Sequence, residues 1–158
     1  MRNTVSFLEA ERLFHAQEAL QYSESNPTEV TDVYWLYATR QIGNYPDATQ
    51  RSGKWLVFAT VDQIDEVWKK IKKATEEGKL GGSSKVSTNM PKANASNVDE
   101  KVICVYTYDW TDEEDVTRVR EELRKMGITR NIPYKSDDDT RQGKYRAAGD
   151  TNISKRYE

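Results

Sequence analysis

Hydrophobic and polar residues follow two different periods along this chain, and these periods separate the expected helices from the expected strands. Apolar residues that recur every three or four positions lie on one face of an α-helix. Three stretches have this pattern: 5–22, 64–74 and 116–126. Short runs rich in aromatic and β-branched residues predict strands instead. These runs are 33–40, 53–59, 85–88, 102–107, 132–135 and 143–145.

The second and third helices carry recognisable residues at both ends. Thr60 and Asp62 are both candidates for the N-cap of the second helix, where a side-chain oxygen accepts a hydrogen bond from a backbone amide. The run from Thr111 to Glu114 matches a capping box at the start of the third helix. A glycine in the left-handed conformation is expected to end each helix. These glycines are Gly78 and Gly127.

The order of the elements predicts the architecture. A strand, a Thr cap, a helix, a glycine and a strand occur twice, over residues 55–88 and 102–135. Two such units favour a single α+β domain over residues 1–158, whose sheet carries both helices on one face and leaves the other face open to a ligand. Residues 33–146 are expected to form the core, with a mobile loop at 89–100 and a frayed tail at 151–158.

Length, charge and cysteine content narrow the class of protein. The chain of 158 residues has the usual size of one domain, and its net charge of −2 gives no reason to expect nucleic acid or an anionic membrane as a partner. Cys104 is the only cysteine, which excludes an internal disulfide and a multi-cysteine zinc site. The first residues have no apolar signal core and no stretch is long enough to span a bilayer, so we expect a cytoplasmic protein.

Several stretches, in a fixed order, resemble one known family. They are 53–56, 76–81 with Lys85 and Val86, 102–106, 109–114, and Tyr134 and Lys135 followed by Asp137, Thr140, Gly143 and Tyr145. Together they resemble the basophilic-leukaemia-expressed protein family over about residues 33–146. The resemblance implies the α+β fold of the mRNA cap-binding translation factor: a curved, mainly antiparallel sheet with two or three helices packed on its convex face. Members of the family also carry a provisional label of phosphothreonine lyase.

A nucleotide site needs flat surfaces for a base and fixed positive charge for phosphate. Aromatic residues on the predicted strands supply the first, and lysines and arginines near the strand ends supply the second. Each strand turns half of its side chains toward the core, so only some of these aromatics can meet a ligand. From these residues and from the resemblance we predict a ligand site made of Trp35, Arg40, Lys54, Lys85, Tyr106, Tyr134, Lys135, Thr140, Arg141 and Tyr145.

The predicted function is binding without catalysis and without a cofactor or metal. The ligand is a mononucleotide, a cap-like nucleotide or a cyclic dinucleotide that the protein sequesters; RNA is not indicated by the net charge, and association of two copies is left open. The alternative is an enzyme of the phosphothreonine lyase type or another phosphate-processing enzyme. However, His15 is the only histidine, and Cys104 lies in an apolar run, the usual setting of an inert thiol. A protein-interaction module is the second alternative.

Overall fold

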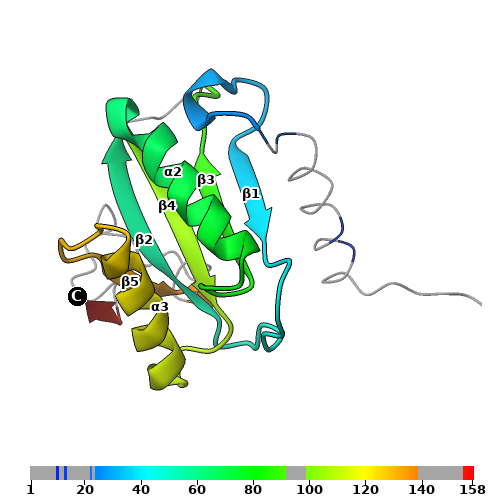
Figure 1. The fold of residues 1–158 in the computed structure, drawn as a ribbon, viewed down its shortest axis with the longest axis vertical. Coiled ribbons are helices and arrows are strands. Elements are labelled where there is room, and N and C mark those ends of the chain that lie inside the picture. The colour runs from blue at the N-terminus through cyan, green and yellow to red at the C-terminus, as the bar shows by residue number, and fades with distance from the viewer. Residues whose placement is uncertain (1–9, 11–12, 14–21, 23, 92–98, 139–154) are drawn as a thin grey trace, which may run out of the picture.

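In the part of the chain that the structure describes, six strands form one antiparallel sheet and two α-helices cover one of its faces (Figure 1). The computed structural model describes residues 10, 13, 22, 24–91, 99–138 and 155–158. The elements are η1 (Pro27–Glu29), β1 (Trp35–Thr39), β2 (Gly53–Thr60), α2 (Val61–Glu76), β3 (Ser83–Ser87), β4 (Glu100–Thr107), α3 (Glu113–Lys125), β5 (Pro133–Ser136) and β6 (Arg156–Tyr157). The strands lie in the order β1-β3-β4-β2-β5-β6. The predicted α+β fold with both helices on one face is therefore confirmed.

Alternation of side chains along the strands separates a core face of the sheet from an open face. Leu36, Val57 and Ile103 point from three strands toward the helices and are buried. Trp55 of β2 lies on the same face, and its indole Nε1 donates a hydrogen bond to the Val116 carbonyl at 3.0 Å. The helices complete this core with their apolar stripes, which are Ile64, Trp68 and Ile71 of α2 and Val116, Val119 and Leu123 of α3.

The predicted ends of the helices are confirmed at both C-termini. Gly78 and Gly127 have φ angles of +76° and +97°, the left-handed conformation that ends a helix at little cost only for glycine. At the start of α2 the N-cap residue is Thr60, although its side chain makes no capping hydrogen bond.

The predicted capping box at the start of α3 is wrong. The N-cap residue is Asp112, whose carboxylate accepts a hydrogen bond from the Asp115 amide at 3.2 Å. The Thr111 hydroxyl donates instead to Asp109 Oδ1 at 2.6 Å. Thr111 is drawn into this turn because a buried carboxylate competes for the hydroxyl more strongly than a backbone amide does.

The end of the chain adds a short strand to the edge of the sheet. Arg156 of β6 lies opposite Tyr134 of β5, and the Glu158 amide donates to the Ile132 carbonyl at 3.1 Å. The buried guanidinium of Arg120 fixes this end further, because its Nε donates to the Glu158 carbonyl at 2.8 Å. The expected frayed tail is therefore wrong at residues 156–157.

Other predictions concern residues outside the described part. They are most of the helix at 5–22, positions 92–98 of the loop, the strand at 143–145 and the start of the tail at 151–154. The candidate ligand residues Thr140, Arg141 and Tyr145 lie outside it as well.

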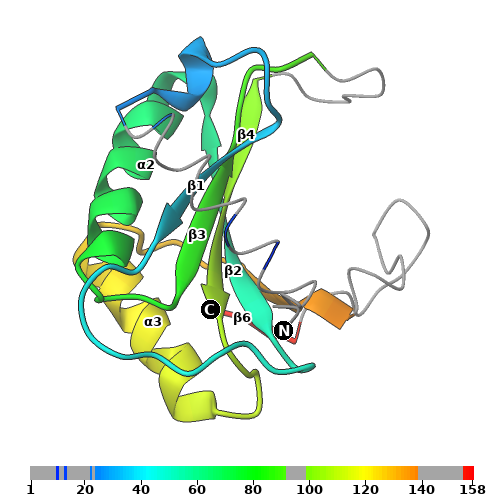
Figure 2. The same ribbon diagram turned by 90° about the vertical axis from the view of Figure 1, so that its right-hand side faces the viewer.

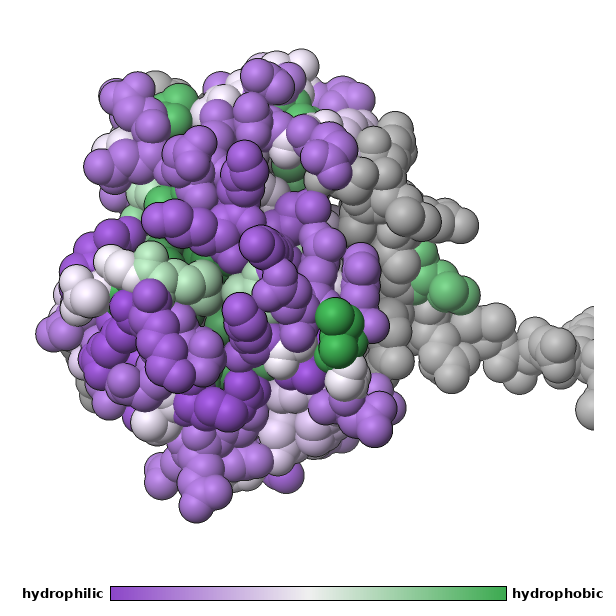
Figure 3. All heavy atoms as spheres, viewed as in Figure 1, coloured by the Kyte–Doolittle hydropathy of each residue, from purple (hydrophilic) through white to green (hydrophobic). Residues whose placement is uncertain are grey.

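The sheet is curved, with α2 and α3 on its convex side (Figure 2). The face that carries the helices is mainly hydrophilic (Figure 3), as expected of a surface that faces water. Among the described residues, no helix combines the length and apolar character needed to cross a membrane. The fold thus leaves the concave side of the sheet as the place for the predicted site.

Candidate functional site

The centre of the concave face is formed by side chains from β1, β3 and β4. Lys85 of β3 lies opposite Tyr37 of β1 on one side and opposite Cys104 of β4 on the other. Residues opposite one another in an antiparallel pair share a face of the sheet, and so do residues two positions apart on one strand. Trp35, two positions from Tyr37, therefore lies on the concave face too.

The next row of the concave face carries the other predicted basic residues. Tyr106, two positions from Cys104, lies opposite Lys54 of β2, and Lys54 in turn lies opposite Lys135 of β5. The structure therefore places five of the predicted site residues on one face, although their contact with a ligand stays a prediction. These residues are Trp35, Lys54, Lys85, Tyr106 and Lys135.

The lysines of this face lie against aromatic rings. Lys85 Nζ is 4.0 Å from the centroid of the Trp35 ring and 5.9 Å from that of Tyr106. Lys54 Nζ is 5.6 Å from the centroid of the same Tyr106 ring. An ammonium within about 6 Å of a ring centroid is attracted by the negative face of the ring. The two charges are thereby held in place beside the aromatic rings.

Lys54 and Lys135 are unusually buried for lysines. Only 9% of Lys54 and 7% of Lys135 is exposed, and a buried charge is costly unless an opposite charge or polar groups compensate it. Asp137 contributes part of this compensation, because its Oδ1 lies 2.6 Å from Lys54 Nζ. Ser52 Oγ donates to the other oxygen of Asp137 at 2.7 Å, which fixes the carboxylate beside the lysine.

The thiol of Cys104 forms part of the floor between the lysines. Burial raises its pKa, while the nearby charges of Lys85 and Lys54 act in the opposite direction. Because the effect of burial is the larger, the thiol stays protonated at neutral pH. A protonated thiol is a poor nucleophile, so Cys104 is part of the packing of this face.

A pocket of about 590 Å³ adjoins the Tyr106 end of the concave face. Tyr106, Gly82 and Ser83 line it from the sheet side, and the β1–β2 loop lines it from the other side with Asn44 and Tyr45. Ligand pockets in proteins typically measure about 300–1,000 Å³. This pocket therefore has the size of a small-molecule site.

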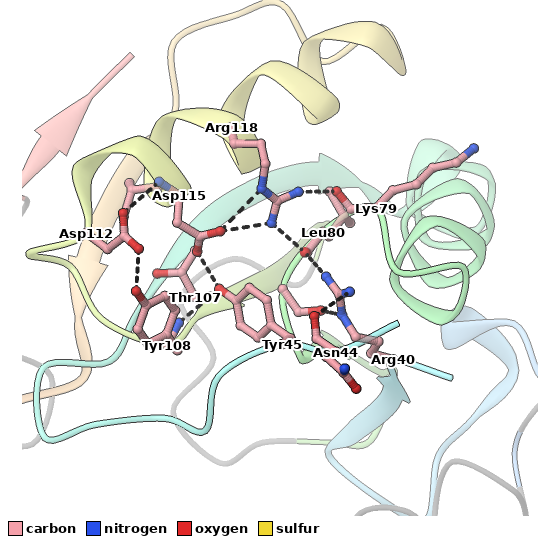
Figure 4. A network of polar contacts seen from close by, with 12 residues as sticks. Arg40, Asn44, Tyr45, Lys79, Leu80, Thr107, Tyr108, Asp112, Asp115 and Arg118 are labelled. Atoms are coloured by element: carbon pink, nitrogen blue, oxygen red, sulfur yellow. Dashed lines mark hydrogen bonds and ion pairs between the residues drawn. The ribbon is translucent and has the colours of Figure 1, made fainter. Parts of the chain in front are cut away.

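A hydrogen-bond network holds Tyr45 in the wall of this pocket (Figure 4). The Tyr45 hydroxyl donates to Asp115 Oδ2 at 2.5 Å and accepts from the Tyr108 amide at 3.1 Å. Arg118 also binds Asp115, with its Nη2 2.9 Å from Oδ1. Burial, followed by the contact with Asp115, raises the pKa of Tyr45 far above its usual range, so the phenol stays protonated. The wall is consequently fixed before a ligand arrives.

Arg40 has a structural role in the folded protein, and its contact with a ligand stays a prediction. It lines the pocket, but its guanidinium donates to backbone carbonyls, including that of Leu80 from Nη2 at 2.7 Å and that of Gly81 from Nε at 3.2 Å. Its guanidinium carbon also lies 4.9 Å from the centroid of the Tyr45 ring. Arg40 therefore joins the β1–β2 loop to the turn before β3, and it uses its donors on these backbone carbonyls.

The prediction of Tyr134 as a ligand residue is wrong. Tyr134 has no exposed surface and packs on the core face, where its ring centroid lies 5.1 Å from that of Trp55. Its hydroxyl shares a hydrogen bond of 2.6 Å with Thr107 Oγ1. Lys135, the next residue, points to the opposite face, so only one of this pair can meet a ligand.

The residues of the pocket wall are not among the predicted site residues. Tyr45 lies between the predicted strands at 33–40 and 53–59, and its neighbours Gly43, Asn44 and Pro46 are typical turn residues. An aromatic residue within such a polar loop was the signal available for a binding function. Among the described residues no group of three or more His, Cys, Asp or Glu side chains is arranged to hold a metal ion.

Comparisons with known proteins agree with the fold. The model of the family described as "Basophilic leukemia-expressed protein Bles03" matches residues 38–141. A schistosome eIF4E complexed with m7GpppA and 4E-BP has a TM-score of 0.62 at 14% identity, covering 100% of this chain and 91% of the solved one. The complex of schistosome eIF4E with m7GpppG and 4E-BP has a TM-score of 0.60 at 14% identity and the same coverages, 100% and 91%. At this identity the likeness shows the fold alone.

Proposed function

The chain belongs to the Basophilic leukemia-expressed protein Bles03 family, and we propose that it binds a nucleotide, or a similar small ligand with phosphate groups, on the concave face of its sheet. The observation that carries this proposal is Lys85, whose ammonium lies 4.0 Å from the ring centroid of Trp35 and 5.9 Å from that of Tyr106. A nucleotide presents the matching chemistry, because it joins a flat base to an anionic phosphate.

The three lysines of the face would hold the phosphate. Charge-assisted hydrogen bonds from ammonium groups to phosphate oxygens are short and strong. Lys54 and Lys135 lie opposite one another on neighbouring strands, and Lys85 lies one row away. A phosphate over these rows can contact ammonium groups from more than one strand, while its base stacks on Trp35 or Tyr106.

The solved relatives in fold support the same class of ligand. The two schistosome eIF4E structures contain m7GpppA and m7GpppG, each with phosphates between two nucleosides. Another protein of this fold therefore binds a nucleotide ligand.

Binding without conversion is favoured over catalysis by the chemistry of the face. Cys104 lies opposite Lys85, and its thiol is protonated because burial raises its pKa. His15 lies outside the described residues. A phosphothreonine lyase needs a positioned base together with a group that protonates the leaving phosphate.

Binding can be measured by tryptophan fluorescence with GMP, GpppG, cyclic di-GMP and a phosphothreonine peptide, followed by mass analysis of the recovered ligand. We expect a nucleotide to bind and to be recovered intact. Lys85→Met keeps the length of the side chain but removes its charge, so it should weaken binding roughly 10- to 150-fold, the equivalent of about 1.5–3 kcal/mol.

Lys70→Met is the matched control, because Lys70 is exposed on α2, on the other side of the sheet. It should leave the dissociation constant unchanged within about twofold. A panel without any bound nucleotide, or equal affinities of wild type and Lys85→Met, contradicts the proposal. A ligand recovered in altered form would indicate the enzyme instead.

A further inference from the structure

Two aromatic surfaces of the concave face lie on either side of one lysine. Because Lys85 Nζ is 4.0 Å from the Trp35 centroid and 5.9 Å from the Tyr106 centroid, the two centroids are no more than about 10 Å apart. Trp35 and Tyr106 nevertheless come from different strands, with β3 between them in the sheet. The arrangement along the face is thus aromatic, cation, aromatic.

The pocket extends this arrangement beyond Tyr106. Tyr106 lines it from the sheet, and Asn44 and Tyr45 line it from the β1–β2 loop. An amide side chain such as that of Asn44 can both donate to and accept from the edge of a base. With about 590 Å³, the pocket offers room for a nucleoside in addition to whatever stacks on Trp35.

We propose that the ligand is a dinucleotide, with one base at Trp35, its phosphates at Lys85 and Lys54, and the second base in the pocket beside Tyr106. This inference rests on the proposed function, since it assigns the ligand class of the same face. A mononucleotide uses one aromatic surface and the cation, and leaves the second surface and the pocket unused. A ligand with a base on each side of its phosphates uses all of them.

The pocket is rigid enough to select such a ligand. Tyr45 is fixed by its hydrogen bonds to Asp115 and to the Tyr108 amide, and the guanidinium of Arg40 lies over its ring. A site formed before the ligand arrives loses little conformational entropy on binding. The second base should therefore add to the affinity.

Gly82 is a position from which a larger side chain can fill the pocket. It is not among the glycines with positive φ, and a Cβ at this position would lie 3.6 Å from Tyr45 Cδ2, an ordinary van der Waals contact. Gly82→Leu therefore places an apolar side chain in the pocket. Gln63→Leu is the matched control, because Gln63 is exposed on α2, on the convex side of the sheet.

The test compares GMP with GpppG and cyclic di-GMP by calorimetric titration of the full chain. At least one dinucleotide should bind wild type ten or more times more tightly than GMP. Gly82→Leu should reduce that advantage to less than threefold and change the affinity for GMP by less than threefold, whereas Gln63→Leu should behave as wild type. If Gly82→Leu lowers the melting temperature markedly, Ser83→Leu narrows the same pocket from β3 and should give the same result.

The outcomes separate this inference from the proposed function. If GMP binds as tightly as both dinucleotides, or if neither pocket variant reduces the advantage of the dinucleotide, the two-base ligand is wrong while nucleotide binding stands. If none of the three ligands binds, both proposals are wrong. A capped RNA of about ten nucleotides serves as a last probe. If it binds more tightly than GpppG, the natural ligand is the 5′ end of an RNA; if the RNA and GpppG bind equally tightly, the ligand is a free dinucleotide. Both results support the inference.

Discussion

Asp109 forms hydrogen bonds with residues before β2 and before α3, and replacing it by asparagine should lower the free energy of unfolding. Its carboxylate accepts hydrogen bonds from Arg51 Nη2 at 2.9 Å, Thr49 Oγ1 at 2.9 Å and Thr111 Oγ1 at 2.6 Å. It also accepts from Arg51 Nε at 3.2 Å and from the Thr111 amide at 2.9 Å. Only 5% of Asp109 is exposed, so these donors stand in for most of the water around the charge.

The loss in Asp109→Asn can be worked out from these contacts. An asparagine of the same shape keeps one acceptor oxygen, which can stay with Thr111, but it turns an NH2 group toward Arg51 and Thr49. Arg51 then loses its ion pair and rehydrates, since its side chain is 53% exposed. Hydrogen bonds to charged groups contribute about 1.5–3 kcal/mol each and are not additive, so we expect the free energy of unfolding to fall by about 2–3 kcal/mol at pH 7. The melting temperature should fall by roughly 5–10 °C.

Urea unfolding followed by tryptophan fluorescence measures this change, and its pH dependence tests the cause. Burial alone would raise the pKa of Asp109, but the hydrogen bonds from Thr111, Arg51 and Thr49 outweigh it and hold the pKa well below its usual value. As pH falls below the unfolded value of about 3.9, the unfolded chain takes up the proton first and the stability from Asp109 is progressively lost. The difference between wild type and Asp109→Asn should therefore shrink between pH 5 and pH 3.

Asp62→Asn serves as the control, because Asp62 is exposed in the first turn of α2 and its loss should cost less than about 1 kcal/mol. A loss of under about 0.5 kcal/mol for Asp109→Asn at pH 7 would refute the reasoning about the magnitude. An equal loss at pH 7 and pH 3 would refute the reasoning about the charge.

Two further experiments test the packing of the sheet, one by substitution of glycine and one by the reactivity of Cys104. Gly53→Ala should lower the free energy of unfolding by about 1–3 kcal/mol, because its Cβ would lie 2.3 Å from the Tyr134 hydroxyl. Gly82→Ala is the control, because its Cβ would lie 3.6 Å from the nearest atom. It should change the free energy of unfolding by under about 0.5 kcal/mol in the same urea titration. Cys104 is 4% exposed and burial raises its pKa, so it should react with a disulfide reagent at pH 8 far more slowly in the native protein than in urea. Equal rates in both states would show that the thiol is accessible.

The helices could be predicted well from the sequence because each buries one face. The apolar stripes of α2 and α3 repeat with the helical period, and the glycines after them have the expected positive φ. The start of α3 could not be predicted, because the competition for Thr111 comes from Asp109, whose burial depends on the folded loop. The strand at 156–157 was missed because a pair of residues has no period to detect and is defined by its pairing with β5.

The residues of the site could be predicted by type but not by face. Along β2 apolar residues occupy both faces, with Trp55 and Val57 toward the helices and Leu56 and Phe58 on the concave side, so alternation alone does not show which face is covered. Tyr134 was assigned to the ligand for this reason. The role of Arg40 could not be predicted either, because the carbonyls it binds, those of Leu80 and Gly81, come close to it only in the folded chain.

The distribution of charge on the concave face is hard to explain by stability. Lys54 and Lys135 lie directly opposite one another on neighbouring strands, an arrangement in which like charges repel. Both are also nearly buried, so each loses much of its hydration. Asp137 lies beside Lys54, with its Oδ1 2.6 Å from Lys54 Nζ. Apolar residues of similar volume at such positions are often neutral or stabilising. Two lysines on this row, with Lys85 one row away, are the arrangement expected if the face binds a phosphate group as proposed.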